Sequence, residues 1–144
     1  MEHLDPPAPE LWDERRLWFE AEQARLAEAG ASRVSEQAAA LMVDLQAVFC
    51  AGAWAAALLL AASVVEAQLR GGKGGGVDWR GDRDLAWLRR RRNALIHETP
   101  SGPGLTIEDH WTRRDQWEAA ARRACRLAMA VLYDRPRHGT DQPP

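Results

Sequence analysis

Ten consecutive residues, Arg89 to Glu98, carry the side chains of this sequence that are best suited to chemistry. They read Arg-Arg-Arg-Arg-Asn-Ala-Leu-Ile-His-Glu. Guanidinium groups hold phosphate oxygens and stabilise negative charge in a transition state, and an imidazole that titrates near neutrality moves protons. An arginine cluster joined to one histidine is therefore what phosphodiester chemistry without a metal would use.

The spacing of these residues along a helix decides which of them can cooperate. Asn93 and His97 are one turn apart and share a face of a regular helix, and Arg90 and His97 share a face at two turns. Arg92 and His97 are five residues apart and diverge by about 140° on a helix with about 3.6 residues per turn. They meet only if the helix loosens before Thr99, if the arginine side chain wraps around, or if a second subunit brings its own pair alongside.

The rest of the chain predicts helices that position this segment. Apolar residues recur at helical spacing over five stretches, which are 10–29, from Ser35 past Phe49, 53–70, from Asp82 or Asp84 to near Glu98, and from between Glu108 and Asp115 to Tyr133. Gly52 is expected to bend or interrupt the chain between the second and third stretches, and the third is apolar nearly all round. No stretch alternates with a period of two residues. The fold class is therefore all-α, an up-and-down bundle of four to five helices.

The domain organisation follows from length and from prolines and glycines. A chain of 144 residues has the size of a single domain. We expect the bundle to span 10–133, with a disordered segment over 1–9, where three prolines stand, and a flexible tail over 134–144. Gly30 supplies a helix stop. The glycine-rich segment 71–76 is expected to be a flexible connector and not a phosphate loop, since no strand precedes it and no Gly-Lys-Ser or Gly-Lys-Thr closes it.

The charge is distributed unevenly along the chain. The formal net charge is −2, but residues 70–137 carry fifteen basic residues against nine acidic ones. This locally basic half is compatible with a phosphate-bearing partner. The uncharged run from Val48 to Val65 reaches the minimum length of a membrane span, but its many alanines favour a buried core helix, so we expect no membrane partner.

The remaining residue types point to a cytoplasmic protein without a metal or cofactor. Cys50 and Cys125 lie in apolar helical stretches, which is typical of small buried side chains in a reducing compartment. The acidic, proline-rich amino end does not have the profile of a signal peptide. His97 and His110 have no metal-ligand spacing to either cysteine, and no cofactor is implied.

The segment Arg92-Asn93-Ala94-Leu95-Ile96-His97 resembles the signature of the HEPN family of helical domains, an arginine usually followed by a polar residue and, a few residues later, a histidine. The preceding alanine-rich stretch, 55–70 with Glu66, looks like a helix with an inward acid found in a subset of these bundles. The resemblance covers 35–133. It implies that two chains pack with both Arg92 and His97 pairs in one cleft, forming a metal-independent endoribonuclease.

The resemblance also implies roles for single residues. His97 would be general base or acid, Arg92 would hold the scissile phosphate, and Asn93 would orient His97 or the phosphate. Glu66 would pair with the arginines from inside the bundle, or be a buried acid of structural value only. Arg90 and Arg91 also stand at tolerated distances from His97, so which arginine pairs with it stays open. The residues expected to track an RNA backbone are Arg89, Arg90, Arg91, Arg122 and Arg123.

Two functions from different classes follow. A homodimeric ribonuclease of this kind would suit a toxin or phage-defence component with an antitoxin protein as partner. The alternative is a non-catalytic helical module for dimerisation, nucleotide or RNA binding, or partner docking, which would use its tryptophans and arginines for contact.

Overall fold

A computed structural model describes residues 2–28, 34–71 and 81–133, and these ranges form an all-α bundle. The helices are α1 (Pro9–Ala27), α2 (Glu36–Ala51), α3 (Trp54–Arg70), α4 (Arg83–Ile96), α5 (Ile107–Thr112) and α6 (Arg114–Leu132). The described ranges contain no strand, and their single β-bridge joins Thr99 to Gly102. The predicted fold class is confirmed, with one short helix, α5, beyond the expected four or five.

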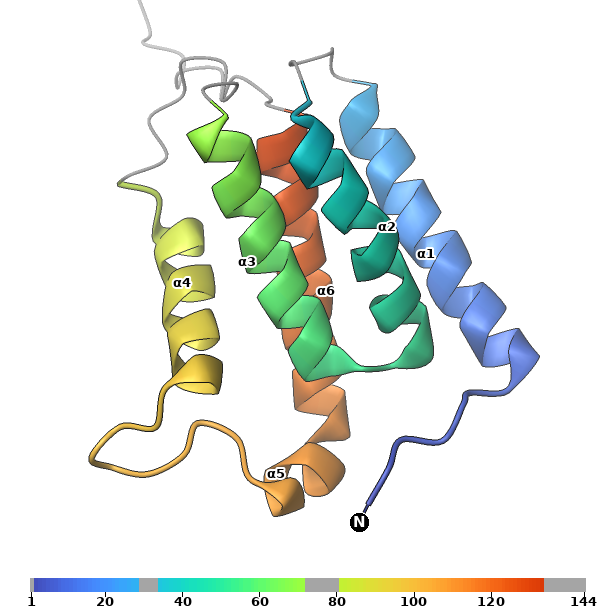
Figure 1. The fold of residues 1–144 in the computed structure, drawn as a ribbon. Coiled ribbons are helices and arrows are strands. Elements are labelled where there is room, and N and C mark those ends of the chain that lie inside the picture. The colour runs from blue at the N-terminus through green and yellow to red at the C-terminus, as the bar shows by residue number, and fades with distance from the viewer. Residues whose placement is uncertain (1, 29–33, 72–80, 134–144) are drawn as a thin grey trace, which may run out of the picture.

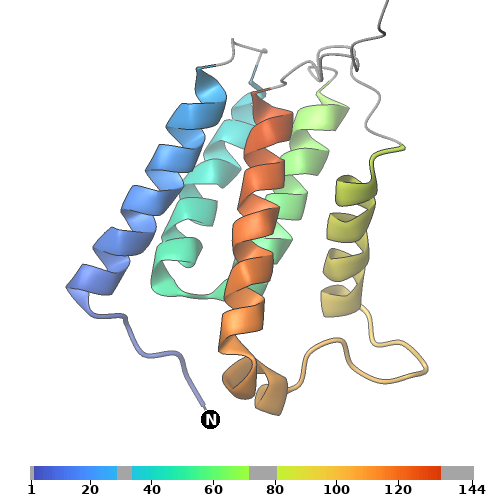
Figure 2. The ribbon, with the colours of Figure 1, turned by 180° about the vertical axis from the view of Figure 1, so that it is seen from behind.

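The long helices alternate in direction along the chain, as an up-and-down bundle requires. Figures 1 and 2 show α1, α2, α3 and α6 side by side, with α4 flanking α3 and α6 at one edge. The most extensive packing is that of α3 on α6 and on α2, so α3 is the central helix, as its apolar sequence predicted. Helix α4 contacts only α3 and α6 among the described helices.

The helix boundaries follow from capping chemistry. Ser35 accepts a hydrogen bond from the Ala38 amide at 3.3 Å, which caps α2 as predicted. Of the two residues predicted to start α4, Asp82 is the cap, because its Oδ1 accepts a hydrogen bond from the Asp84 amide at 2.8 Å. Gly52 ends α2 with a left-handed φ of +77°, which interrupts the uncharged run at that point. No helix in the described ranges has both the length and the apolar character needed to cross a bilayer.

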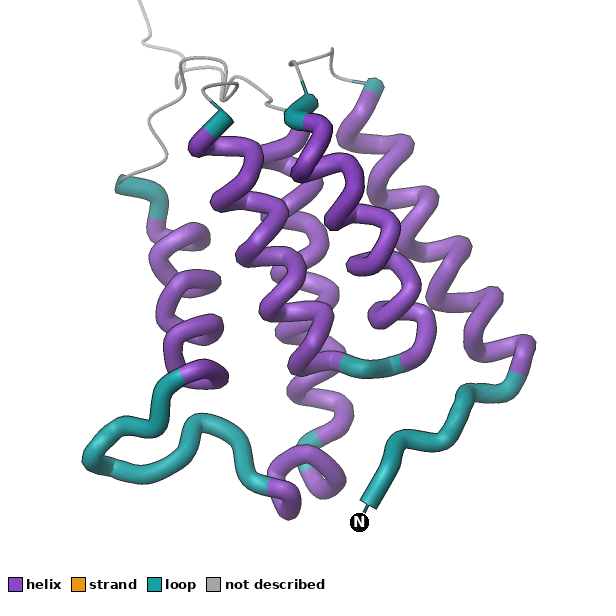
Figure 3. The backbone as a smooth tube through the Cα atoms, viewed as in Figure 1, coloured by secondary structure: helices purple, strands orange, loops and turns teal. Residues whose placement is uncertain are grey.

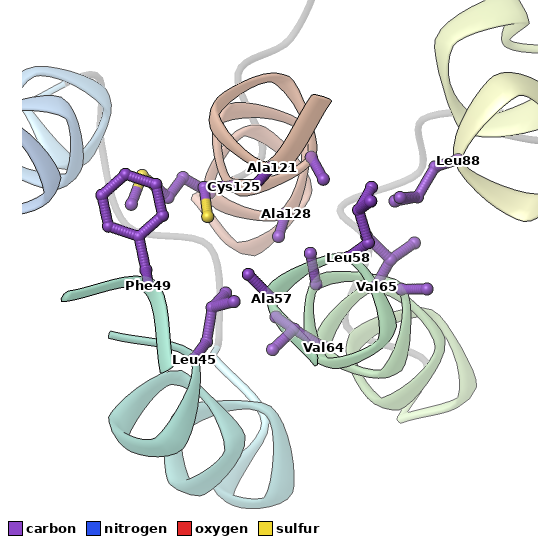
Figure 4. Close-up of a cluster of buried hydrophobic side chains, with 14 of the residues drawn as sticks. Leu45, Phe49, Ala57, Leu58, Val64, Val65, Leu88, Ala121, Cys125 and Ala128 are labelled. Atoms are coloured by element: carbon purple, nitrogen blue, oxygen red, sulfur yellow. The ribbon is translucent and has the colours of Figure 1, made fainter. Parts of the chain in front are cut away.

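Small side chains line the contact between α3 and α6. Ala57 and Ala61 of α3 and Ala121 and Ala128 of α6 are completely buried. Larger side chains fill the space around this contact, and Figure 4 shows them converging from four helices: Leu45 and Phe49 of α2, Leu58, Val64 and Val65 of α3, Cys125 of α6 and Leu88 of α4. Both cysteines are buried as predicted. Burial raises the pKa of the Cys125 thiol to about 12, which keeps it neutral in the core.

Helix α6 begins at Arg114, within the predicted range, but the short helix before it was not predicted. Thr106 and Asp109 form a reciprocal capping box that starts α5, and the backbone leaves the helical region at Arg113. Residues 2–8 follow a defined non-helical path, where disorder was predicted, and Glu2 accepts a hydrogen bond from the Trp111 indole. Pro9 does not block helix formation, because it occupies the first turn of α1, where no amide donor is needed. The Gly30 stop, the connector from 72 onward and the tail 134–144 lie outside the described residues.

Candidate active site

Helix α4 ends one residue before the candidate catalytic histidine. The last helical residue is Ile96, and His97 has extended backbone angles (φ −121°, ψ 123°) while its amide still donates to the Asn93 carbonyl at 2.9 Å. The helix was predicted to end near Glu98, and the structure ends it at Ile96. The expected face shared by Asn93 and His97 therefore does not apply, since His97 is no longer helical.

A tight turn closes the loop that follows His97. The amide of Thr99 donates to the Gly102 carbonyl at 3.2 Å, and the Gly102 amide donates back to the Thr99 carbonyl at 2.8 Å. Gly102 has a φ of +114°, which an L side chain rarely adopts. Figure 3 shows this loop running from the end of α4 to α5. His97 is exposed at its start, and its side chain makes no hydrogen bond or ion pair with any described residue.

A glycine holds the loop against the end of α4. The position that a Cβ of Gly104 would occupy lies inside van der Waals contact of the Ala94 carbonyl oxygen, and 3.0 Å from the Ala94 Cβ. Only glycine permits this approach. The loop that begins at His97 is therefore fixed at its far end to the helix that carries the arginines.

We expect the substitution Gly104→Ala to displace the loop 97–106 from α4. The atom in the way is backbone and cannot rotate aside, so the loop itself must move, at a cost of about 1 kcal/mol in the free energy of unfolding. Amide NMR shifts should change over 94–106 and little elsewhere. Gly81→Ala is the matched control, because nothing lies within 4 Å of its added carbon. Equal spectral changes in the two variants would contradict the packing described.

Arg92 is held on the α3 side of α4 by two oxygen atoms. Its Nη1 lies 3.4 Å from Oε1 of Glu66 and donates to Oδ1 of Asn93 at 3.2 Å. The pairing of Glu66 with an arginine was predicted, but its position was not. The Glu66 side chain is 43% exposed on α3, so it does not approach from inside the bundle. The Arg92 side chain is 34% exposed and so remains accessible to a ligand.

Two further arginines of α4 are free to contact a ligand. Arg89 and Arg90 are exposed, and no ion pair joins either to a described carboxylate. Arg89 lines a small groove between α3 and α4 together with Arg92 and Glu66, with Leu85 and Leu88 among its apolar walls. Of the residues predicted to bind phosphate, Arg89 lies on the Arg92 side of α4, and both Arg89 and Arg90 are open to solvent.

The other predicted phosphate ligands lie against tryptophan rings. Arg91 lies over Trp117, with 4.9 Å between its guanidinium carbon and the ring centroid. Arg123 lies 4.0 Å over Trp87 and forms an ion pair with Asp84 at 2.9 Å. These contacts attach α4 to α6 through cation–π interactions.

Arg122 is likewise separated from Arg92. Its guanidinium lies 4.5 Å over the ring of Trp18 on α1, and 3.8 Å separates it from a carboxylate oxygen of Glu118. Arg91, Arg122 and Arg123 therefore act first as packing groups between helices. Arg91 also lies 6.0 Å from the ring centroid of Trp87, and the sequence carried a signal for this contact, because the two residues are four apart on one helix.

The interpretation of this site rests on the residues described above. Comparisons with protein-family models, curated proteins and solved structures find no match for this chain. Within the described ranges, no three histidine, cysteine, aspartate or glutamate side chains gather in a way that would hold a metal ion. The candidate active site consists of Arg92 with Glu66 and Asn93, the exposed Arg89 and Arg90, and His97 at the helix end.

Proposed function

We propose that this chain is a metal-independent endoribonuclease of the HEPN type, in which Arg92 binds the scissile phosphate and His97 transfers protons. The observation that supports it most is the end of α4 at Ile96, which leaves the imidazole exposed directly after the arginine-rich helix. An exposed histidine keeps both ring nitrogens available to substrate, which a proton-transfer role needs.

The contacts of Arg92 favour a phosphate-binding role. Glu66 and Asn93 both reach the same nitrogen, Nη1, and the structure gives Nε and Nη2 no hydrogen bond with a described residue. A guanidinium held in this way is oriented but keeps two donors for a bidentate contact with phosphate oxygens. Arg89 and Arg90 add positive charge for the neighbouring phosphates.

The reaction that fits these groups is an internal transesterification. A neutral imidazole takes the proton of the ribose 2′-hydroxyl while its oxygen forms a bond to phosphorus. The bond from phosphorus to the 5′ oxygen breaks, and a protonated imidazole supplies the proton that this leaving oxygen needs. The products are a 2′,3′-cyclic phosphate and a 5′-hydroxyl, and Arg92 stabilises the charge that develops on the phosphate.

Two copies of the chain complete the site in this proposal. No hydrogen bond joins His97 to a described residue of its own chain, so a second chain would bring the imidazole and guanidinium groups to one phosphate. Ile96 is an exposed large apolar side chain next to His97, and a homodimer would cover it. A cytoplasmic RNase of this kind would act as a toxin or defence component and would need an antitoxin to restrain it.

A non-catalytic docking module is the second candidate. Leu17 of α1 and Val43 of α2 are large apolar side chains that remain mostly exposed, at 58% and 69%. Exposed apolar groups on two neighbouring helices favour a protein partner. In that case the arginines of α4 would bind RNA or a nucleotide without cleaving it.

The test is incubation of the purified full chain with total RNA in EDTA, followed by analysis of the new ends. The proposal expects cleavage, with 2′,3′-cyclic phosphate and 5′-hydroxyl ends, because no step needs a metal ion. Intact RNA across a range of pH and salt, together with retained binding, would favour the docking module. Cleavage that EDTA abolishes would contradict the proposed chemistry.

A further inference from the structure

Two arginines from opposite ends of the sequence converge on the turn between α2 and α3. Nη1 of Arg15 donates to the Cys50 carbonyl at 3.1 Å, and Nη2 of Arg114 donates to the Gly52 carbonyl at 2.8 Å. The position that a Cβ of Gly52 would occupy lies 2.9 Å from the first nitrogen and 3.1 Å from the second. The two cationic nitrogens are therefore no further apart than the sum of these distances.

The described carboxylates near this pair of charges form their ion pairs with other arginines. Neither Arg15 nor Arg114 has an ion pair with an acidic side chain of the described residues. Glu118, one turn further along α6, lies 3.8 Å from Arg122, and Glu20 pairs with Arg16. Burial, followed by the charge of Arg15, lowers the pKa of Arg114. The charge of Glu118 offsets this lowering of the Arg114 pKa only in part.

The contacts that do exist use little of the donor capacity of the two side chains. The ring of Trp54 lies 4.8 Å from the guanidinium carbon of Arg15 and 5.5 Å from that of Arg114. Each guanidinium carries five N–H donors, and one nitrogen of each is bonded to a carbonyl. Arg15 is only 8% exposed, and its Nε is buried without a partner. A buried donor without an acceptor needs a physical explanation, and an anion that brings an acceptor to it would provide one.

We propose that Arg15 and Arg114 form a binding site for a phosphate group at the α2–α3 turn. A tetrahedral oxyanion supplies several acceptor oxygens and the negative charge that the pair lacks. Arg114 is partly exposed and gives the ion its access, while the nearly buried Arg15 fixes the depth of the site. The site is separate from Arg92 and His97, although the α2–α3 turn and the end of α4 lie at the same end of the bundle (Figure 1).

The first test is thermal unfolding of the full chain in sodium phosphate against sodium chloride at matched pH and ionic strength. We expect a saturable rise in Tm of about 3–6 °C in phosphate, because a ligand that binds only the folded state stabilises it. Arg114→Gln should lose the rise in Tm, because the glutamine side chain carries no charge. Its amide group keeps a donor for the Gly52 carbonyl. Arg113→Gln is the matched control. The Arg113 guanidinium pairs with Asp109 and its side chain is 61% exposed, so the rise in Tm should remain in this variant.

The outcomes separate this site from the proposed active site. A rise that persists in Arg114→Gln and disappears in Arg92→Ala would overturn the proposal and assign the ion to Arg92. No phosphate-specific rise in the wild type would also overturn it. Should Arg114→Gln fail to fold, calorimetric titration of Arg92→Ala with phosphate makes the same distinction: binding that remains without Arg92 supports the proposed site, and binding that is lost overturns it.

A second arm identifies the source of the phosphate. The affinity for a short single-stranded RNA is compared between the wild type and Arg114→Gln by fluorescence anisotropy. A loss of about fivefold or more, with a weaker dependence on salt, assigns the site to an RNA backbone. An unchanged RNA affinity together with the phosphate-dependent rise in Tm assigns it to a free phosphate ion.

Discussion

Replacing His97 with alanine should lower the rate of RNA cleavage by about 10²–10⁴-fold, the range that general acid–base groups contribute. Arg92→Ala should cause a loss of similar size by removing the phosphate-binding guanidinium. Both side chains are at the surface, so the free energy of unfolding should change by no more than about 0.5 kcal/mol. Single-turnover cleavage of a defined RNA measures the first effect, and thermal unfolding measures the second.

Matched variants make this result specific. His3→Ala removes an exposed histidine of the N-terminal segment and should cleave at the wild-type rate. Arg92→Lys keeps the charge but loses the planar pair of donors, so we expect it to recover only part of the activity. Wild-type rates in His97→Ala would eliminate the proposed mechanism and leave the fold unaffected.

Mixing the two inactive variants tests the two-chain site. A dimer of one His97→Ala chain and one Arg92→Ala chain still holds one intact imidazole and one intact guanidinium, from different copies. If these groups act across the interface, the mixture should recover part of the activity. Mixtures that stay as inactive as each variant would show that both groups must come from one chain.

Replacing Phe49 with alanine should cost about 3–5 kcal/mol of unfolding free energy, the range for a buried phenylalanine. Its ring is completely buried and lies 5.0 Å from the ring of Trp18, 5.8 Å from that of Phe19 and 5.4 Å from that of Trp54. Each aromatic pair adds to the cost of the cavity. For a domain of this size the loss corresponds to a Tm lower by roughly 10–20 °C.

A surface residue of the same helix provides the comparison for Phe49. Val43 is 69% exposed, so Val43→Ala should change the free energy of unfolding by no more than about 0.5 kcal/mol. Denaturation monitored by circular dichroism measures both variants under one set of conditions. A Tm for Phe49→Ala within a few degrees of the wild type would mean that this aromatic cluster does not support the core.

The helices were predictable because their signals are local. Ser35, Asp82 and Gly52 mark boundaries through hydrogen bonds and backbone angles that involve only their near neighbours in sequence. The capping box of Thr106 and Asp109 is equally local and was present in the sequence, but it was missed because the predicted start of the last helix covered a broad range. Local chemistry thus accounts for most of the fold.

The state of each arginine was not predictable in the same way. The sequence places Arg91 and Arg92 side by side, yet one lies against Trp117 of α6 and the other against Glu66 of α3. Which arginine stays available depends on the rings and carboxylates that distant helices bring to it. Helical spacing alone therefore defines the candidate residues but not their partners.

Helix α4 is attached to the bundle far more weakly than its neighbour. It buries two side chains, Leu85 and Leu88, whereas α3 buries eight. The free energy of a local opening follows the contacts that it breaks, so we expect α4 to open at a lower free energy than that of global unfolding. The arginine-bearing edge would then exchange its amide hydrogens as a unit of its own, before the core opens.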